Sequence, residues 1–148
     1  MSYVPVSMIE FTVHLVAWKT HKDELRAVRE AVFVREQNVP LEEEWDGRDD
    51  ESIHALARNS GGLPIGCGRL LPDGHVGRMA VLAEMRGFGV GAAILERLVD
   101  AARERGFAEI VLSSQVHAIE FYQRYGFKTE GDTYMDAGIP HRTMRRSL

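Results

Sequence analysis

The chain has 148 residues, of which 45% are hydrophobic and 27% charged. This length and composition suit one globular domain spanning 1–148, and they exclude a disordered or fibrous protein. The formal net charge of -4 argues against a general affinity for nucleic acid, whose phosphates attract basic surfaces.

Targeting and redox features point to the cytoplasm. Met1 to Met8 lacks the basic start and apolar run of a signal peptide, and no later apolar run is long enough to span a membrane. The single cysteine, Cys67, has no partner for an internal disulfide and offers no cysteine cluster for a metal. We therefore expect a cytoplasmic protein with no membrane partner and no metal site.

The first third of the chain is expected to hold a strand, a helix and an acidic loop. Apolar, β-branched and aromatic residues over 9–18 predict the strand. Apolar residues at helical spacing predict a helix over 21–35, which Thr20 and Asp23 would open as a capping box. Seven acids between Glu42 and Glu51 predict a largely solvated loop.

Turn residues divide the middle of the chain into strands. The segments 52–59 and 64–71 are strand-like and are separated by Ser60-Gly61-Gly62, so they predict an antiparallel hairpin. A second turn over 72–74 leads into a strand over 75–81.

The remainder alternates helices and strands. An amphipathic helix is predicted over 90–105, followed by a buried strand over 109–113 and a short helix over 118–125. The segments 128–134 and 142–145 are plausible closing strands. No repeat or linker interrupts this order, so one α/β layer structure is expected.

Glycines at the start of the helix over 90–105 indicate an anion site. Gly87, Gly89 and Gly91 lack the Cβ atoms that would keep a pyrophosphate away from the first helical N–H groups. Those N–H groups have no intrahelical partner and lie at the positive end of the helix dipole. Arg86 adds a full positive charge and bidentate hydrogen bonds.

Three other interpretations of this turn are possible. A plain helix start that needs flexible glycine is the simplest. A Walker loop does not fit, because Ala92-Ala93 stands where Lys and Ser or Thr are required. A nicotinamide-binding turn matches over 87–92, but 82–86 separates the glycines from the preceding strand, and no acid follows the next strand at 113–115.

Two motifs resemble those of GNAT acyltransferases. Arg86-x-x-Gly89-x-Gly91 is similar to the family's CoA pyrophosphate signature, and 118–127 resembles its Ala-x-x-x-Tyr-x-x-x-Gly-Phe helix and turn. The resemblance covers nearly the whole chain. The segments 29–37 and 138–141 further resemble the ElaA-like bacterial branch of the family.

The resemblance implies an α/β (α+β) fold with a mixed, mostly antiparallel central sheet of six to seven strands and about four flanking helices. The sheet would be splayed at its middle, between the strands over 75–81 and 109–113, with acetyl-CoA as co-substrate and no metal. The residues expected to bind CoA are Met79, Ala80, Val81, Arg86, Gly87, Phe88, Gly89, Val90, Gly91, Ala92, Gln115 and Tyr122.

By the same resemblance, the acetyl group passes directly to a primary amine, and Tyr122 gives a proton to the departing thiolate. A backbone N–H near Ala80 or Val81 would polarise the thioester carbonyl. Gln115 stands where many relatives have asparagine. A non-catalytic acyl-CoA-binding module is the alternative, since CoA binding and catalysis depend on different residues.

The acceptor side is expected to involve Glu36, Glu43, Glu44 and His141. Acids there would attract a cationic small-molecule or peptide amine. The candidates for a general base are Glu36 and the histidines at 54, 117 and 141, with a water chain to solvent as the alternative. Cys67 has no evident base beside it and is expected to be a packed core thiol. The oligomeric state is expected to be monomer or homodimer.

Overall fold

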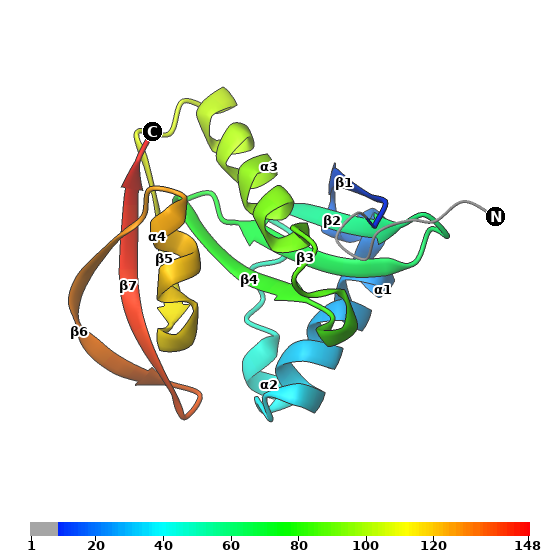
Figure 1. The fold of residues 1–148 in the computed structure, drawn as a ribbon, viewed down its shortest axis with the longest axis horizontal. Helices are drawn as coiled ribbons and strands as arrows, with labels where there is room; N and C mark the ends of the chain where they lie inside the picture. Colours follow the sequence, from blue (N-terminus) through cyan, green and yellow to red (C-terminus); the bar gives the residue numbers. More distant parts are fainter. Residues whose placement is uncertain (1–8) are drawn as a thin grey trace.

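The computed structural model describes residues 9–148 and contains a seven-stranded sheet with helices on both faces (Figure 1). Met1 to Met8, where no signal peptide is predicted, lies outside the described residues. The strands are β1 Phe11–Val16, β2 Ile53–Asn59, β3 Pro64–Leu70, β4 His75–Val81, β5 Glu109–Gln115, β6 Lys128–Asp136 and β7 Ile139–Ser147. The helical segments are α1 Trp18–Arg29, η1 Glu30–Glu36, α2 Leu41–Glu44, η2 Ala83–Met85, α3 Val90–Glu104, η3 Val116–Ala118 and α4 Ile119–Arg124.

The strand pairing leaves a split in the sheet. In the order β1-β2-β3-β4-β5-β7-β6, every neighbouring pair is antiparallel except β4 and β5. These two strands pair only at His75 with Val111 and at Val76 with Leu112. Beyond Val76, β4 keeps its partner β3 but leaves β5, so its edge is bare as far as Val81. The predicted mixed, mostly antiparallel sheet, splayed at its middle and flanked by about four helices, is confirmed, since four α-helices lie within the described part of the chain.

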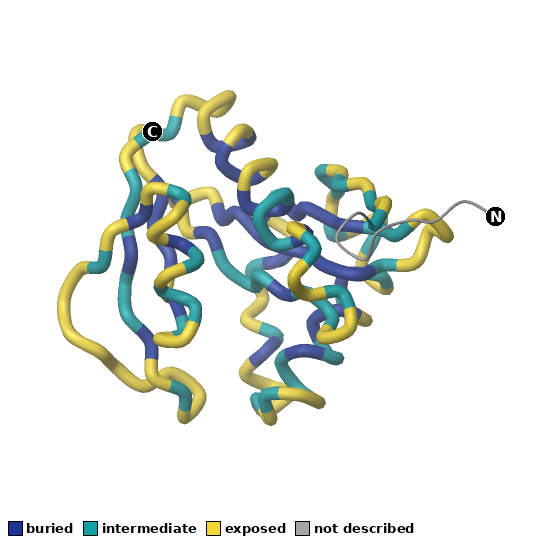
Figure 2. Tube along the Cα trace, viewed as in Figure 1, coloured by how far each residue is buried: buried dark blue, intermediate teal, exposed yellow. Residues whose placement is uncertain are grey.

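The split separates two arms. One arm holds β1 to β4 with α1, α2 and α3, and the other holds β5, β7, β6 and α4 (Figure 1). One core packs α3 and α4 against the sheet, on what we call the α3 face, and a second core packs α1 on the opposite α1 face. Figure 2 shows that burial concentrates in the central strands, whereas β6 at the edge is almost wholly exposed. No helix within residues 9–148 is long and apolar enough to cross a membrane.

Two glycines in β3 allow the close approach of α3. A Cβ atom at Gly66 would lie 2.9 Å from Ile94 Cδ1, and one at Gly68 would lie 2.8 Å from Ile94 Cγ2. Cys67, between them, points to the α1 face and is buried in its core. Burial raises the pKa of Cys67 to about 12, so the thiol stays protonated. The predicted packed core thiol is confirmed.

The first helix differs from the prediction at both ends. It begins at Trp18 rather than at 21, because the Trp18 side chain joins the core of the α1 face. The predicted capping box is wrong, since the Thr20 hydroxyl instead donates to the Ala17 carbonyl at 3.1 Å and the backbone kinks at His21. After α1, the coil widens into the π-helical segment η1, a distortion often found at functional sites.

The C-terminal hairpin is longer than predicted. Ala137 and Gly138 both have positive φ, 50° and 75°, which suits a two-residue turn between strands. Ile139 and Pro140 therefore pair with β6, and β7 begins at 139 rather than at 142. As a result, His141 lies in a strand and not in a turn.

Candidate active site

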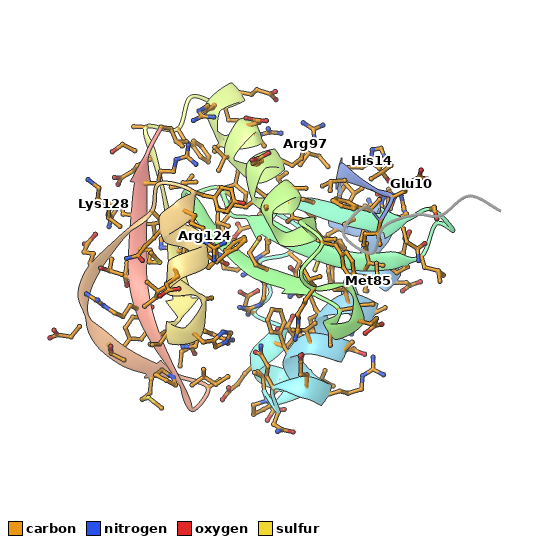
Figure 3. All side chains as sticks on the ribbon, viewed as in Figure 1. Glu10, His14, Met85, Arg97, Arg124 and Lys128 are labelled. Carbon is orange, nitrogen blue, oxygen red and sulfur yellow. The ribbon has the colours of Figure 1, made fainter. Side chains whose placement is uncertain are left out.

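A cleft of about 960 Å³ follows the split between the two arms. Figure 3 labels one lining residue from each arm, Met85 after β4 and Arg124 on α4. The predicted site residues that line the cleft are Glu43, Glu44, Met79, Ala80, Val81, Arg86, Gly87, Gly89, Val90, Gly91, Ala92, Gln115, Tyr122 and His141. The described lining does not include the other two, Phe88 and Glu36.

The glycine turn fits an anion at the start of α3. Gly87 and Gly89 have φ values of 86° and 83°, which L side chains rarely adopt. A Cβ atom at either position would meet nothing within 4 Å, so space is open where a side chain would otherwise stand. Gly89 is the N-cap of α3, and the first helical N–H groups beyond it have no intrahelical acceptor. The turn therefore offers backbone donors without a side chain in front of them.

Arg86 is held at the rim of this turn. Its Nε donates to the Val81 carbonyl at 3.0 Å, and its Nη2 donates to Glu36 Oε2 at 2.6 Å. This bond to Arg86 lowers the pKa of Glu36. The structure thus joins a residue predicted for CoA to one predicted for the acceptor entrance, and it fixes the guanidinium beside the end of β4.

Tyr122 lies on α4 and faces the cleft from the α3 face. Its ring packs edge-on against Phe121 and Phe127, at centroid distances of 5.0 Å and 5.8 Å. Burial raises the pKa of Tyr122 to about 12, so the phenol is protonated across the physiological range. Aromatic packing on two sides therefore holds the ring of a protonated tyrosine in the cleft lining.

The acidic segment is exposed at five of its seven acids, as its charge predicts, but not at Glu44 and Asp49. Residues 41–44 form α2, and Glu44 and Asp49 are 2% and 6% exposed. Arg29, itself 1% exposed, donates through Nε to Glu44 at 2.5 Å and through Nη1 to Asp49 at 2.7 Å. The prediction is wrong for these two acids, because the charge that neutralises them comes from a distant part of the chain.

Two strand arginines complete this ion-pair cluster. Arg69 of β3 makes a bidentate contact with Asp46, at 3.0 Å and 2.8 Å, and also reaches Asp49. Arg78 of β4 donates to the Glu44 carbonyl at 3.2 Å. Its own φ is 49°, at a bulge opposite β3, a backbone conformation uncommon for residues other than glycine.

The cluster sets the protonation of its acids. Burial would raise the pKa of Asp49, but hydrogen bonds and charge from Arg29 and Arg69 outweigh it, so the pKa is lowered. For Glu44, burial outweighs the opposing effect of Arg29 and Arg78, so the pKa is raised.

Sequence reasoning missed Arg69 and Arg78, both of which line the cleft. The available signal was an arginine directly after glycine within each apolar strand, Gly68-Arg69 and Gly77-Arg78. A charge in such a strand needs a buried partner.

A chain of polar side chains crosses the cleft. Gln115 Nε2 donates to Gln37 Oε1 at 2.9 Å, and His117 Nε2 donates to Gln115 Oε1 at 2.6 Å. Gln37, which follows η1, was not predicted as a site residue. Within residues 9–148 this is the one side-chain hydrogen bond recorded between the two arms. It ties the end of η1 to the end of β5.

The three candidate histidines occupy different environments. His54 is buried against Trp18 and donates from Nε2 to the Asp49 carbonyl at 2.9 Å, so it is a satisfied core histidine. Burial lowers its pKa. His117 and His141 line the cleft. His141 donates from Nδ1 to the Ile139 carbonyl at 2.7 Å.

The nicotinamide-binding alternative and the question of a metal site can both be compared with this geometry. A nicotinamide-binding unit needs a parallel sheet, whereas β4 and β5 are the one parallel pair within residues 9–148 and they separate after two residue pairs. Among residues 9–148, no three His, Cys, Asp or Glu side chains are grouped to hold a metal ion. A split mixed sheet beside a glycine-rich helix start is instead the architecture of the acyltransferase class that the two sequence motifs predict.

Comparison with known proteins agrees with this class. The family model described as an acetyltransferase (GNAT) domain matches residues 20–148, and the chain belongs to this family. It is 41% identical over 123 residues to the uncharacterized N-acetyltransferase YjcF of Bacillus subtilis, covering 80% of this chain and 87% of that protein.

Solved structures show the same fold. A putative N-acetyltransferase from Lactobacillus plantarum has a TM-score of 0.85 and 27% identity, covering 93% of this chain and 98% of that one. Escherichia coli ElaA has a TM-score of 0.81 and 28% identity, covering 95% of this chain and 100% of that one. The resemblance to ElaA noted in the sequence is therefore confirmed.

Proposed function

We propose that this chain is an acetyl-CoA-dependent N-acetyltransferase that moves an acetyl group to a primary amine by direct transfer. The observation that carries the proposal is the split itself. β4 leaves β5 after Val76, and the gap is lined on one side by its bare edge and on the other by Tyr122. A substrate in that gap can be reached from both faces of the sheet.

The residues present fit acetyl-CoA, which would supply the acetyl thioester. Gly87 and Gly89 leave open space before the N-terminus of α3, where pyrophosphate oxygens would accept from backbone N–H groups. Arg86 stands at the rim of that space with its charge. The bare edge over 79–81 offers N–H and C=O groups to the pantetheine arm, and an N–H near Ala80 or Val81 would polarise the thioester carbonyl.

Tyr122 would act as the general acid. Its protonated hydroxyl can donate to the sulfur as the C–S bond breaks, and its ring is already held by Phe121 and Phe127. Because the ring is already fixed, Tyr122 would lose less conformational entropy on reaching the transition state than a proton donor on a mobile side chain.

The acceptor would enter on the α1 face, where α2 borders the cleft. Of the acids expected to attract a cationic amine, Glu44 is neutralised by Arg29 and Arg78, whereas Glu43 is exposed and lines the cleft. A preference for cationic amines would therefore depend on Glu43.

The test is acetyl transfer from acetyl-CoA to a panel of neutral and cationic primary amines, with Tyr122→Phe as the variant. We expect the wild type to release free thiol and the variant to bind CoA normally while losing roughly 10²-fold or more in turnover. Turnover within a few-fold of wild type would make Tyr122 structural. CoA binding without thiol release on any amine would instead identify a non-catalytic acyl-CoA-binding module.

A further inference from the structure

Of the three histidines in the described cleft lining, His141 is the buried one, and its tautomer is fixed. A carbonyl oxygen can only accept, so the 2.7 Å contact between His141 Nδ1 and the Ile139 carbonyl places the proton on Nδ1. In the neutral ring, Nε2 then carries a lone pair and no proton. His117 has the opposite arrangement, because its Nε2 donates to the Gln115 amide oxygen.

The His141 ring is also held in place. It is 8% exposed, and Tyr134 of β6 stacks on it with ring centroids 6.1 Å apart and an interplanar angle of 20°. The Tyr134 hydroxyl is in turn hydrogen-bonded to Ser113 of β5. Within the described residues, no hydrogen bond engages Nε2 of His141, although the residue lines the cleft. Nε2 of His141 is therefore held in place and has no hydrogen-bond partner among the described residues.

Strand alternation places His141 on the face opposite Tyr122. In β7, Met144 belongs to the core of the α3 face together with Tyr122. Side chains alternate between faces along a strand, so His141, three residues before Met144, points to the α1 face. Its register partner Gln115 points the same way and reaches Gln37 on that face.

We propose that His141 is the general base of the transfer, acting through Nε2 on the amine that enters from the α1 face. The inference rests on the proposed acetyl transfer. As the amine nitrogen bonds to the thioester carbon, the nitrogen becomes positively charged and its proton becomes acidic. Nε2 takes that proton, the C–S bond breaks, and the sulfur takes a proton from the Tyr122 hydroxyl. Solvent then returns a proton to Tyr122 and removes one from His141, so atoms and charge balance.

The opposite placement of the two groups suits this sequence of events. Proton removal from a nucleophile and proton delivery to the leaving group on the same carbon can be carried out by two separate groups. Nε2 faces the entry side and the phenol faces the other side, so neither group has to serve both substrates. Glu36, the remaining protein candidate, is bonded to Arg86 at 2.6 Å and lies outside the described cleft lining.

The variant His141→Asn separates this role from packing. An asparagine amide can keep the donation to the Ile139 carbonyl, but it has no group in the place of Nε2. We expect unchanged CoA affinity, little change in melting temperature, and a fall in kcat of about 10²- to 10⁴-fold with a strongly basic amine. The exposed cleft histidine His75, which contacts Asp73 at 3.0 Å, supplies the control His75→Asn, which should keep wild-type turnover.

Acceptor basicity distinguishes a base from a structural residue. A weakly basic acceptor such as hydroxylamine loses its proton to water more readily after attack, so the defect of His141→Asn should shrink by at least about tenfold with it. Equal defects on both acceptors, or wild-type turnover, would overturn the proposal.

Nitrogen-15 NMR of the wild-type histidine rings supplies a readout that needs no turnover. In the neutral His141 ring we expect a protonated Nδ1 and a bare Nε2, and a neutral ring with its proton on Nε2 would overturn the proposal. If the wild type acetylates no amine, the proposed function fails, and the ring spectrum still decides whether Nε2 is available to accept a proton.

Discussion

The acidic segment over 42–51 and the glycine turn over 86–91 both border the cleft. Side-chain charges determine the properties of the acidic segment, whereas backbone groups determine those of the glycine turn. In the acidic segment, Glu44 and Asp49 are buried and are met by arginines of the same chain. In the glycine turn, the space before the N–H groups of α3 is open. In the acidic segment, the buried charges are neutralised within the chain and form a rigid side of the cleft. In the glycine turn, the backbone N–H donors have no acceptor and remain available to a ligand.

The largest expected change is a loss of stability on breaking the buried ion pairs of Arg29. Arg29→Met would leave Glu44 and Asp49 buried without their shared partner, and removal of one member of a buried ion pair costs about 3–5 kcal/mol. We expect a loss of that size in the free energy of unfolding, measured by urea denaturation.

The control for this variant is Arg58→Met. Arg58 also makes a bidentate contact, with Glu24 at 2.8 Å and 2.7 Å, but the two side chains are 25% and 34% exposed. Its loss should cost only about 0.2–1 kcal/mol. Equal losses for the two variants would mean that burial does not distinguish the cluster from an ordinary surface pair.

The two regions also differ in how far the sequence predicts them. The glycine turn was located because its signal is local: an arginine, alternating glycines and an amphipathic helix stand together in the chain. The burial of Glu44 and Asp49 within the acidic segment was missed, because the partners Arg29, Arg69 and Arg78 lie on α1, β3 and β4. Ion pairs between distant segments leave no periodic pattern in the sequence, so only the folded structure reveals them.

The same limit applies to single side chains and to element ends. The strands follow from their periodicity and the split of the sheet from the resemblance that the two motifs carry, whereas the start of α1 depends on Trp18 entering a core formed by other elements. His141 could be proposed from its residue type, but its tautomer depends on a turn carbonyl two residues away. Gln37 had no sequence signal, because its role is a contact with Gln115 across the cleft.

The second expected effect concerns ligand binding at the glycine turn. Gly89→Glu would place a carboxylate in the open space before α3, where a pyrophosphate would lie, so we expect the CoA dissociation constant to rise at least about tenfold, or 1.4 kcal/mol. Isothermal titration calorimetry with CoA measures this change.

Backbone strain needs its own control, since Gly89 has a φ of 83°. Gly106, just beyond the other end of α3, has a φ of 77°, and a Cβ atom there also meets nothing within 4 Å. Gly106→Glu should therefore carry a similar strain, about 1–2 kcal/mol, while leaving CoA affinity unchanged. A folded Gly89→Glu protein with wild-type affinity would contradict the assignment of the turn to CoA.

The smallest expected effect lies where the two arms meet. Gln37→Leu removes the hydrogen bond to Gln115 Nε2, while Gln115 keeps its bond to His117. One neutral hydrogen bond contributes about 0.5–1.5 kcal/mol, so the loss in unfolding free energy should be far below that of Arg29→Met. The exposed residue Gln123 on α4 supplies the control Gln123→Leu, which should change stability by less than about 0.5 kcal/mol.

The bridge between Gln37 and Gln115 should matter more for the acceptor than for the fold. Because it ties the end of η1 to the end of β5 beside the cleft, its loss should raise the acceptor KM severalfold and leave CoA affinity unchanged. A double-mutant cycle with Gln115→Leu tests this directly, since two residues that act only through their shared bond give a non-additive result. If Gln37→Leu destabilises the protein as much as Arg29→Met, one polar contact holds the two arms together. The buried ion pairs of Arg29 would then not be the main source of rigidity. Additive effects of the two leucine variants would instead mean that each glutamine acts through other neighbours.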